Sequence, residues 1–155
     1  MAADGVVEVK GVRELRIKLD RVAESVASNK RLMGEIGNFV ELQILTRTAD
    51  GIGADDEPFE AYSVGYERRR SAEGRPTDAV DLFFTGSMLS ALTHDADNDR
   101  VTLFFMDTSD KFGMRNPEKA YYNQQLRNFF ALSAKDVADV TNMVSDYVAK
   151  ALKKG

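Results

Sequence analysis

The chain has 155 residues, with no cysteine and a single histidine, His94. The absence of cysteine excludes disulfide bonds and thiolate metal sites, and it agrees with a reducing cytoplasm. One histidine is too few for the usual zinc site, which takes several His or Cys ligands, and a Ser-His-Asp triad would have to recruit distant residues. We therefore interpret His94 as an ordinary hairpin residue.

The chain also lacks an excess of positive charge and any long apolar run. Its formal net charge is -4 and its pI is about 5.1, which gives no support to a protein that mainly grips DNA phosphates. The first residues have neither the basic start nor the apolar core of a signal peptide. No apolar run approaches the roughly 20 residues that cross a bilayer. We expect no membrane partner and synthesis into the cytoplasm.

The composition is that of an ordinary globular domain, with 43% hydrophobic and 30% charged residues. At this length, residues 1–155 are predicted to form one domain with a substantial core. Residues 1–11 are expected to be an extended N-terminal arm, in which Val6 to Val9 alternatively forms a short strand.

Apolar residues recur at helical spacing in the first third of the chain. The stripe that begins at Val12 and ends at Val26 predicts a first helix from Gly11 onward. A second helix is predicted from Lys30 to Ala49, with Asn29 as its cap. Each helix has one apolar face, so each needs a sheet or a partner subunit to cover it.

Shorter elements are predicted for the middle of the chain. A helix is expected from Ser63 to Arg70, a strand from Val80 to Thr85 and a helical turn from Ser87 to Leu92. Leu92–Ala96 and Val101–Met106 are predicted to form a hairpin, because the Asp- and Asn-rich residues between them favour a turn.

Two helix starts are recognisable near the C-terminus. Pro117 suits the first turn of a short helix, and Ser133 with Asp136 has the form of a capping box that opens a last helix. The predicted fold is therefore α+β, with two N-terminal helices and a C-terminal helix packed on a small antiparallel sheet.

Several acidic clusters resemble metal sites without completing one. Asp95, Asp97 and Asp99 begin like a calcium loop, but Arg100 and Met106 stand where such a loop needs glycine and glutamate. The acidic loop that runs from Asp55 to Glu60 is interpreted as a solvated face, with a magnesium site as the alternative. We therefore expect no metal and no cofactor.

A basic run and paired aromatic residues are the remaining features. The run Arg68-Arg69-Arg70 suits either phosphate contact or, more often, a solvated helix face or an ion pair between subunits. Neighbouring residues on a strand point to opposite faces, so one member of each aromatic pair leaves the core, where helices of the same chain or another subunit cover it. The residues predicted to lie at a subunit interface are Arg68, Arg69, Arg70, Phe59, Tyr62, Phe84 and Phe105.

Three landmarks within residues 36–150 resemble the virion-morphogenesis and tail-completion proteins of tailed phages. The first is Arg47-Thr48-Ala49-Asp50-Gly51, followed by Glu57–Ser63 with its Pro-Phe pair. The second is Val80–Leu89, which contains Thr-Gly-Ser-Met-Leu, and the third is the turn Arg127–Ser133. The segment Ala120–Leu126 departs from the pattern, since it keeps a Gln but not the His and Gly of many relatives.

The resemblance implies a non-catalytic part of a phage particle. Such proteins form rings at the head–tail junction, where they complete the tail so that a DNA-filled head can attach. It implies as partners further copies of the chain and neighbouring neck, connector or tail proteins, with passive contact with DNA in the channel and no sequence-specific binding. The expected location is the virion, reached from the host cytoplasm. The resemblance leaves open which layer of the neck the chain belongs to: completion protein, terminator or connector.

Two alternatives from other functional classes remain. One is a small metal-dependent nuclease that uses the acidic loop and the arginine run. The other is a monomeric protein-binding module unrelated to phages. A nuclease requires carboxylates that converge on one metal ion, whereas a binding module is a stable monomer.

Overall fold

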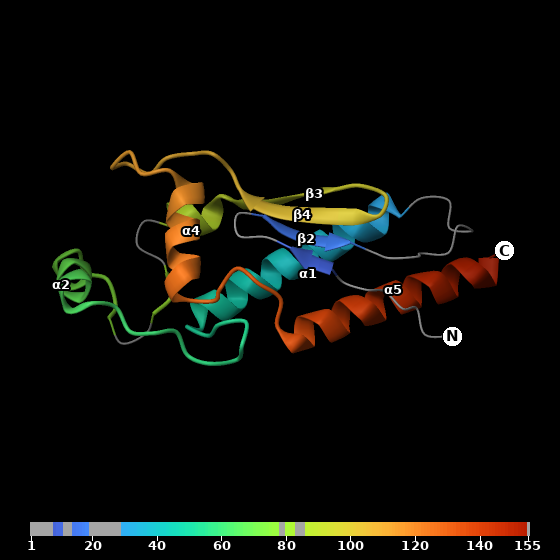
Figure 1. The fold of residues 1–155 in the computed structure, drawn as a ribbon, viewed down its shortest axis with the longest axis horizontal. Helices are drawn as coiled ribbons and strands as arrows, with labels where there is room; N and C mark the ends of the chain where they lie inside the picture. The colour runs from blue at the N-terminus through green and yellow to red at the C-terminus, as the bar shows by residue number, and fades with distance from the viewer. Residues whose placement is uncertain (1–7, 11–13, 19–28, 78–79, 83–85, 155) are drawn as a thin grey trace.

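A four-stranded antiparallel sheet with helices packed against it makes this an α+β protein, as the sequence predicts (Figure 1). The computed structural model describes residues 8–10, 14–18, 29–77, 80–82 and 86–154. The sheet has the strand order β1-β2-β4-β3. The elements in chain order are β1 (Glu8–Lys10), β2 (Leu15–Lys18), α1 (Lys30–Ala49), α2 (Val64–Ala72), α3 (Ser87–Ser90), β3 (Leu92–Ala96), β4 (Arg100–Phe105), α4 (Asn116–Leu126) and α5 (Ala134–Lys154).

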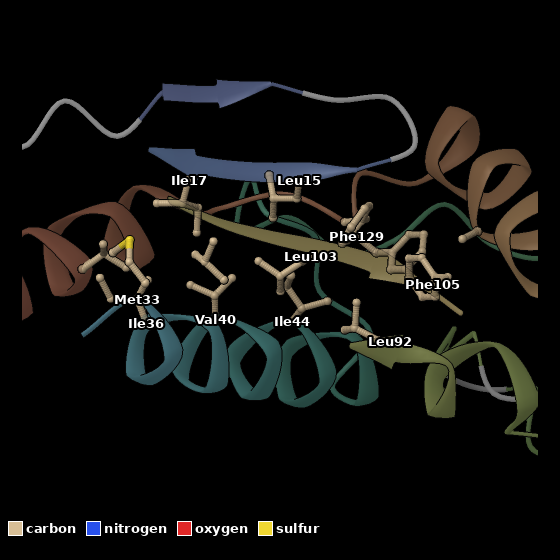
Figure 2. Close-up of a cluster of buried hydrophobic side chains, with 14 of the residues drawn as sticks. Leu15, Ile17, Met33, Ile36, Val40, Ile44, Leu92, Leu103, Phe105 and Phe129 are labelled. Carbon is tan, nitrogen blue, oxygen red and sulfur yellow. The ribbon is translucent and has the colours of Figure 1, made fainter. Parts of the chain in front are cut away.

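The core lies between helix α1 and one face of the sheet (Figure 2). Alternate residues of β2 and β4 point toward α1, because successive side chains of a strand lie on opposite faces. Burying one such aliphatic side chain contributes about 1.5–3 kcal/mol, so this layer provides much of the stability. The buried aliphatic residues of this layer include Leu15, Ile17, Met33, Ile36, Val40, Ile44, Val101 and Leu103.

The predicted hairpin and the bounds of the predicted second helix are confirmed. Strands β3 and β4 pair in the register that begins at Leu92 and Phe105 and ends at Ala96 and Val101. Helix α1 begins at Lys30 and ends at Ala49, and Gly51 follows with a φ of +74°, which favours glycine. Asn29, however, makes no side-chain capping hydrogen bond, so its predicted capping role is wrong.

The prediction of a first N-terminal helix is wrong where the structure describes it. Residues Leu15–Lys18 form β2, which pairs with both β1 and β4. Leu15 and Ile17 are buried while Glu14 and Arg16 are exposed. Buried and exposed side chains therefore alternate with a period of two, which is typical of a strand with one buried face. The rest of the predicted helix, 11–13 and 19–28, lies outside the described residues. Of the two N-terminal helices expected, α1 is the one that packs on the sheet.

The structure favours the strand alternative at the N-terminus, and it corrects the strand predicted from Val80 to Thr85. Residues Glu8–Lys10 are strand β1, so this part of the expected extended arm belongs to the sheet. Val80, Asp81 and Leu82 are not in a strand, and residues 83–85 lie outside the described part of the chain. The helical turn expected after them is present as α3.

Helix α5 begins with the predicted capping box. The Asp136 N–H donates to the Ser133 hydroxyl at 3.0 Å, and the Ser133 N–H donates to the Asp136 carboxylate at 2.9 Å. Val140 and Val144 of α5 are buried in the core. In Figure 1, α5 runs away from the end of the molecule that holds α2 and α4.

Candidate functional site

An open groove with a volume of about 720 Å³ lies at the α2–α4 end of the molecule. Helices α2 and α4 contribute to its walls, together with Met88 of α3 and the segments 60–63 and 110–114. Helix α4 stands across the end of the sheet, and α2 lies further out (Figure 1). A volume of this size lies within the common range for binding sites, which is roughly 300–1,000 Å³.

Tyr62 organises the inner wall of the groove. Two guanidinium groups lie close to its ring, with the Arg70 carbon at 4.8 Å and the Arg127 carbon at 5.0 Å from the ring centroid. Its hydroxyl accepts a hydrogen bond from the Leu82 N–H at 3.0 Å. Burial raises the pKa of the Tyr62 hydroxyl above its ordinary value of 10.0. The residue is therefore a neutral, fixed part of the frame.

Arg70 is buried, although it belongs to a run of three arginines. Its Nε donates to the Pro76 carbonyl at 2.9 Å, and its Nη2 donates to Asp81 at 3.2 Å. The other two members, Arg68 and Arg69, are exposed on α2. The expectation that all three arginines face a partner is therefore wrong for Arg70, whose guanidinium links α2 to the segment that follows it.

Asp110 holds the loop that carries the outer wall. Its carboxylate accepts hydrogen bonds from the Phe112 N–H at 2.8 Å and the Met114 N–H at 3.1 Å, and from Lys119 Nζ at 2.9 Å. The Lys119 ammonium and these two N–H groups hold the pKa of the Asp110 carboxyl below its ordinary value. As a result, Phe112 and Met114 sit in a fixed turn with their side chains exposed.

The walls of the groove expose an unusual amount of apolar surface. Tyr122 and Leu126 on α4 are 61% and 64% exposed, and Phe112 and Met114 are 57% and 51% exposed. These are four of the seven large apolar side chains that are exposed in the described part of the chain, and all four line the groove. A concentration of exposed apolar side chains is typical of a surface that binds another molecule.

Positive charge flanks the apolar wall. The Arg69 guanidinium carbon lies 5.3 Å from the centroid of the Phe112 ring, and Lys111 Nζ lies 5.0 Å from it. Both cations interact with the ring, since an aromatic face attracts positive charge. Arg69, which lines the groove, and the neighbouring Lys111 therefore add positive charge beside the apolar wall, and the exposed Glu60 also lines the groove.

Other predicted interface residues lie elsewhere. Phe105 is 5% exposed and packs in the core against Phe130, with ring centroids 4.9 Å apart, so its predicted place at a subunit interface is wrong. Phe105 follows the inward alternation of β4, and the half-buried Phe104 is the neighbour that points away. Phe59 is half-buried against the core, and Phe84 lies outside the described residues.

The structure thus brings Tyr62, Arg69 and Arg70 together, as residues of one end of the molecule. The apolar wall was not predicted as a site. The adjacent pair Tyr121 and Tyr122 was the available signal for α4, because on a helix adjacent residues face different directions. No periodic pattern marks Phe112 or Met114, which lie in a loop.

A metal-dependent active site requires several carboxylate or histidine side chains close together among the described residues. Within them, no three His, Asp or Glu side chains gather to hold a metal ion. His94 lies on β3, where its Nδ1 is 2.8 Å from a Glu41 carboxylate oxygen. The carboxylate of Asp110 in the groove is already bound by Lys119 and two backbone N–H groups. The groove is suited to binding an apolar surface.

Hydrogen bonds join the first and third landmarks of the phage resemblance to each other. Arg47 of the first landmark donates to the Asp136 carboxylate and to the Ala131 carbonyl, both at 2.7 Å. Arg127 of the third landmark donates to the carbonyls of Glu60 at 3.0 Å and Ala61 at 3.3 Å. The two landmark arginines therefore hold the backbone of segments that are far apart in the sequence.

Comparison with known proteins returned no family model, no curated protein and no solved structure that matches the chain. Among the helices of the described residues, none combines the length and apolar character that crossing a bilayer requires.

Proposed function

We propose that the chain is a non-enzymatic structural subunit of the neck or tail end of a tailed phage. Copies of it form a ring that completes the tail and joins it to the DNA-filled head. The observation that carries the proposal is that Arg47 and Arg127 each link distant segments of the chain through hydrogen bonds. Both are landmark residues of the resemblance, and both donate hydrogen bonds to backbone carbonyls of distant segments.

The groove supports the same proposal. Phe112, Met114, Tyr122 and Leu126 expose apolar surface at one end of the molecule, which a neighbouring protein removes from water when it binds. The net charge of -4 also suits a subunit that surrounds DNA without holding its phosphates tightly.

Complementation tests the proposal directly. A tailed phage from which the gene is deleted is expected to give filled heads and tails that do not join, as seen by electron microscopy. Supplying the chain from a plasmid is expected to restore joined particles. Normal particles in the absence of the chain would overturn the proposal.

The groove by itself also suits a monomeric protein-binding module. Sedimentation velocity separates this second candidate from the first, because a ring subunit associates with itself as concentration rises. A protein that stays monomeric at every concentration and does not restore the phage favours the module.

A further inference from the structure

We propose that the groove receives the β3–β4 turn of a second copy of the chain. This inference rests on the proposed ring function and deepens it, because it names the two surfaces that join successive subunits. The turn comprises residues 97–99, between strands β3 and β4, and Asp95 lies just before it near the end of β3.

Charge complementarity identifies the turn as the occupant. Asp95 and Asp97 are exposed and make no ion pair within the described part of the chain, whereas Asp99 lies 3.6 Å from Arg100. Arg69, which lines the groove, and Lys111 both lie close to the Phe112 ring in its wall. Carboxylates of one copy therefore meet cations of the next.

The positions of the two surfaces fit a head-to-tail contact. Strand β4 leaves the turn at Arg100 and ends at Phe105, on the side where α4 crosses the sheet. The turn thus lies at the end of the sheet that is away from α2 (Figure 1). A contact between two different patches is heterologous, and it generates a ring when the rotation between subunits closes.

Apolar burial adds to the attraction between charges. Tyr122 and Leu126 are four residues apart on α4 and so lie on one face of the helix. The end of the neighbouring hairpin covers this face when its carboxylates reach the mouth. Part of the binding energy is then independent of salt, whereas the contribution of the exposed charges is screened by it.

Cysteine cross-linking tests the contact, because the chain contains no cysteine of its own. The double variant Asn98→Cys/Tyr122→Cys has one thiol on the turn and one in the groove. Mild oxidation is expected to give a ladder of covalent multimers on a non-reducing gel, since each copy joins two neighbours. Each single variant has one thiol and can form only one disulfide, so its cross-linked products are expected to be no larger than a dimer. The variant Asn98→Cys/Met114→Cys repeats the test at a second position of the wall.

The matched control has its second thiol away from the groove. Leu42 on α1 is 59% exposed and does not line the groove, so Asn98→Cys/Leu42→Cys is expected to give no ladder. A ladder of equal yield from this control would overturn the proposal. So would the absence of a ladder from both groove variants, provided that circular dichroism shows them folded.

Sedimentation velocity provides the second measurement. The variant Tyr122→Ser/Leu126→Ser is expected to raise the dissociation constant for self-association by roughly tenfold or more. The control variant Leu42→Ser is expected to leave this constant unchanged. Self-association that is insensitive to the groove variant, or a wild-type protein that is monomeric at all concentrations, overturns the proposed contact.

The two proposals fail in distinguishable ways. Suppose that the wild-type chain restores joined particles to the phage that lacks the gene, but no cross-linked ladder forms and the groove variant self-associates normally. The ring function then stands and the proposed contact is wrong. If copies cross-link through the groove but the phage assembles normally without the chain, the contact stands and the phage function is wrong.

Discussion

Arg47, near the end of α1, donates a hydrogen bond to Asp136, in the first turn of α5, over a distance of 2.7 Å. Their side chains are 10% and 3% exposed, so the pair is shielded from water. Replacing one partner leaves the other charge buried without compensation, which costs about 3–5 kcal/mol. Arg47→Ala is therefore expected to lower the free energy of unfolding by about that amount in urea denaturation.

Arg31→Ala is the control for this prediction. Arg31 lies 3.3 Å from Glu35 on the same helix, but its side chain is 87% exposed. An exposed pair of this kind contributes about 0.3–0.5 kcal/mol. If both variants lowered the free energy of unfolding equally, the buried Arg47–Asp136 pair would not be the strong contribution to stability inferred here from its burial.

Arg70 and Arg68 are predicted to differ, although they are close in the sequence. Arg70→Ala removes the hydrogen bond to the Pro76 carbonyl and the contact with the Tyr62 ring, and is expected to cost about 2 kcal/mol or more. Arg68→Ala, at an exposed site, is expected to change stability by less than about 0.5 kcal/mol. Thermal unfolding of both variants measures the difference, and a large effect at Arg68 alone would contradict it.

Two glycines of α1 are expected to respond to alanine with opposite sign. A Cβ at Gly37 would collide with the His94 ring, so Gly37→Ala must displace β3 or the ring and is expected to lower the melting temperature. A Cβ at Gly34 meets nothing within 4 Å. Gly34→Ala is therefore expected to stabilise the helix by about 0.5–1 kcal/mol. Stabilisation by both substitutions would show that His94 does not pack on Gly37.

The stability of the loop that Asp110 holds at the groove is predicted to depend on pH in the acidic range. Its pKa is lowered from 3.8 in the folded protein, mainly by the hydrogen bond from Lys119. A lowered folded-state pKa contributes stability that is present above 3.8 and is lost as the pH falls through the folded-state value. Lys119→Met is expected to raise the pKa of this carboxyl, as followed by carboxyl-carbon NMR. An unchanged titration would contradict the pairing.

Local signals explain what could be predicted from the sequence. Helix α1 has a stripe of buried residues over its whole length and Gly51 after it, and the hairpin has a turn rich in Asp and Asn. These patterns depend on neighbours a few residues apart. The capping box of Ser133 and Asp136 is another such pattern, and it was predicted with both partners correct.

Features that depend on distant segments could not be predicted. Leu15 fits a helical stripe and a strand equally well, and its pairing with Leu103 of β4 decides between them. Which arginine of the run is buried depends on Tyr62 and Asp81, which lie outside the run. The groove joins α2, α4 and the loop of Phe112, so no single window of sequence contains it.

Asp136 takes part in two structures at once, because its carboxylate both caps α5 and accepts from Arg47. Fraying of the first turn of α5 therefore removes the partner of Arg47, and loss of Arg47 frees the cap. The end of α1 and the start of α5 are expected to open together as one unit of local unfolding. In native-state hydrogen exchange, their backbone amides would then share one opening free energy, although Arg47 and Asp136 are 89 residues apart in the chain.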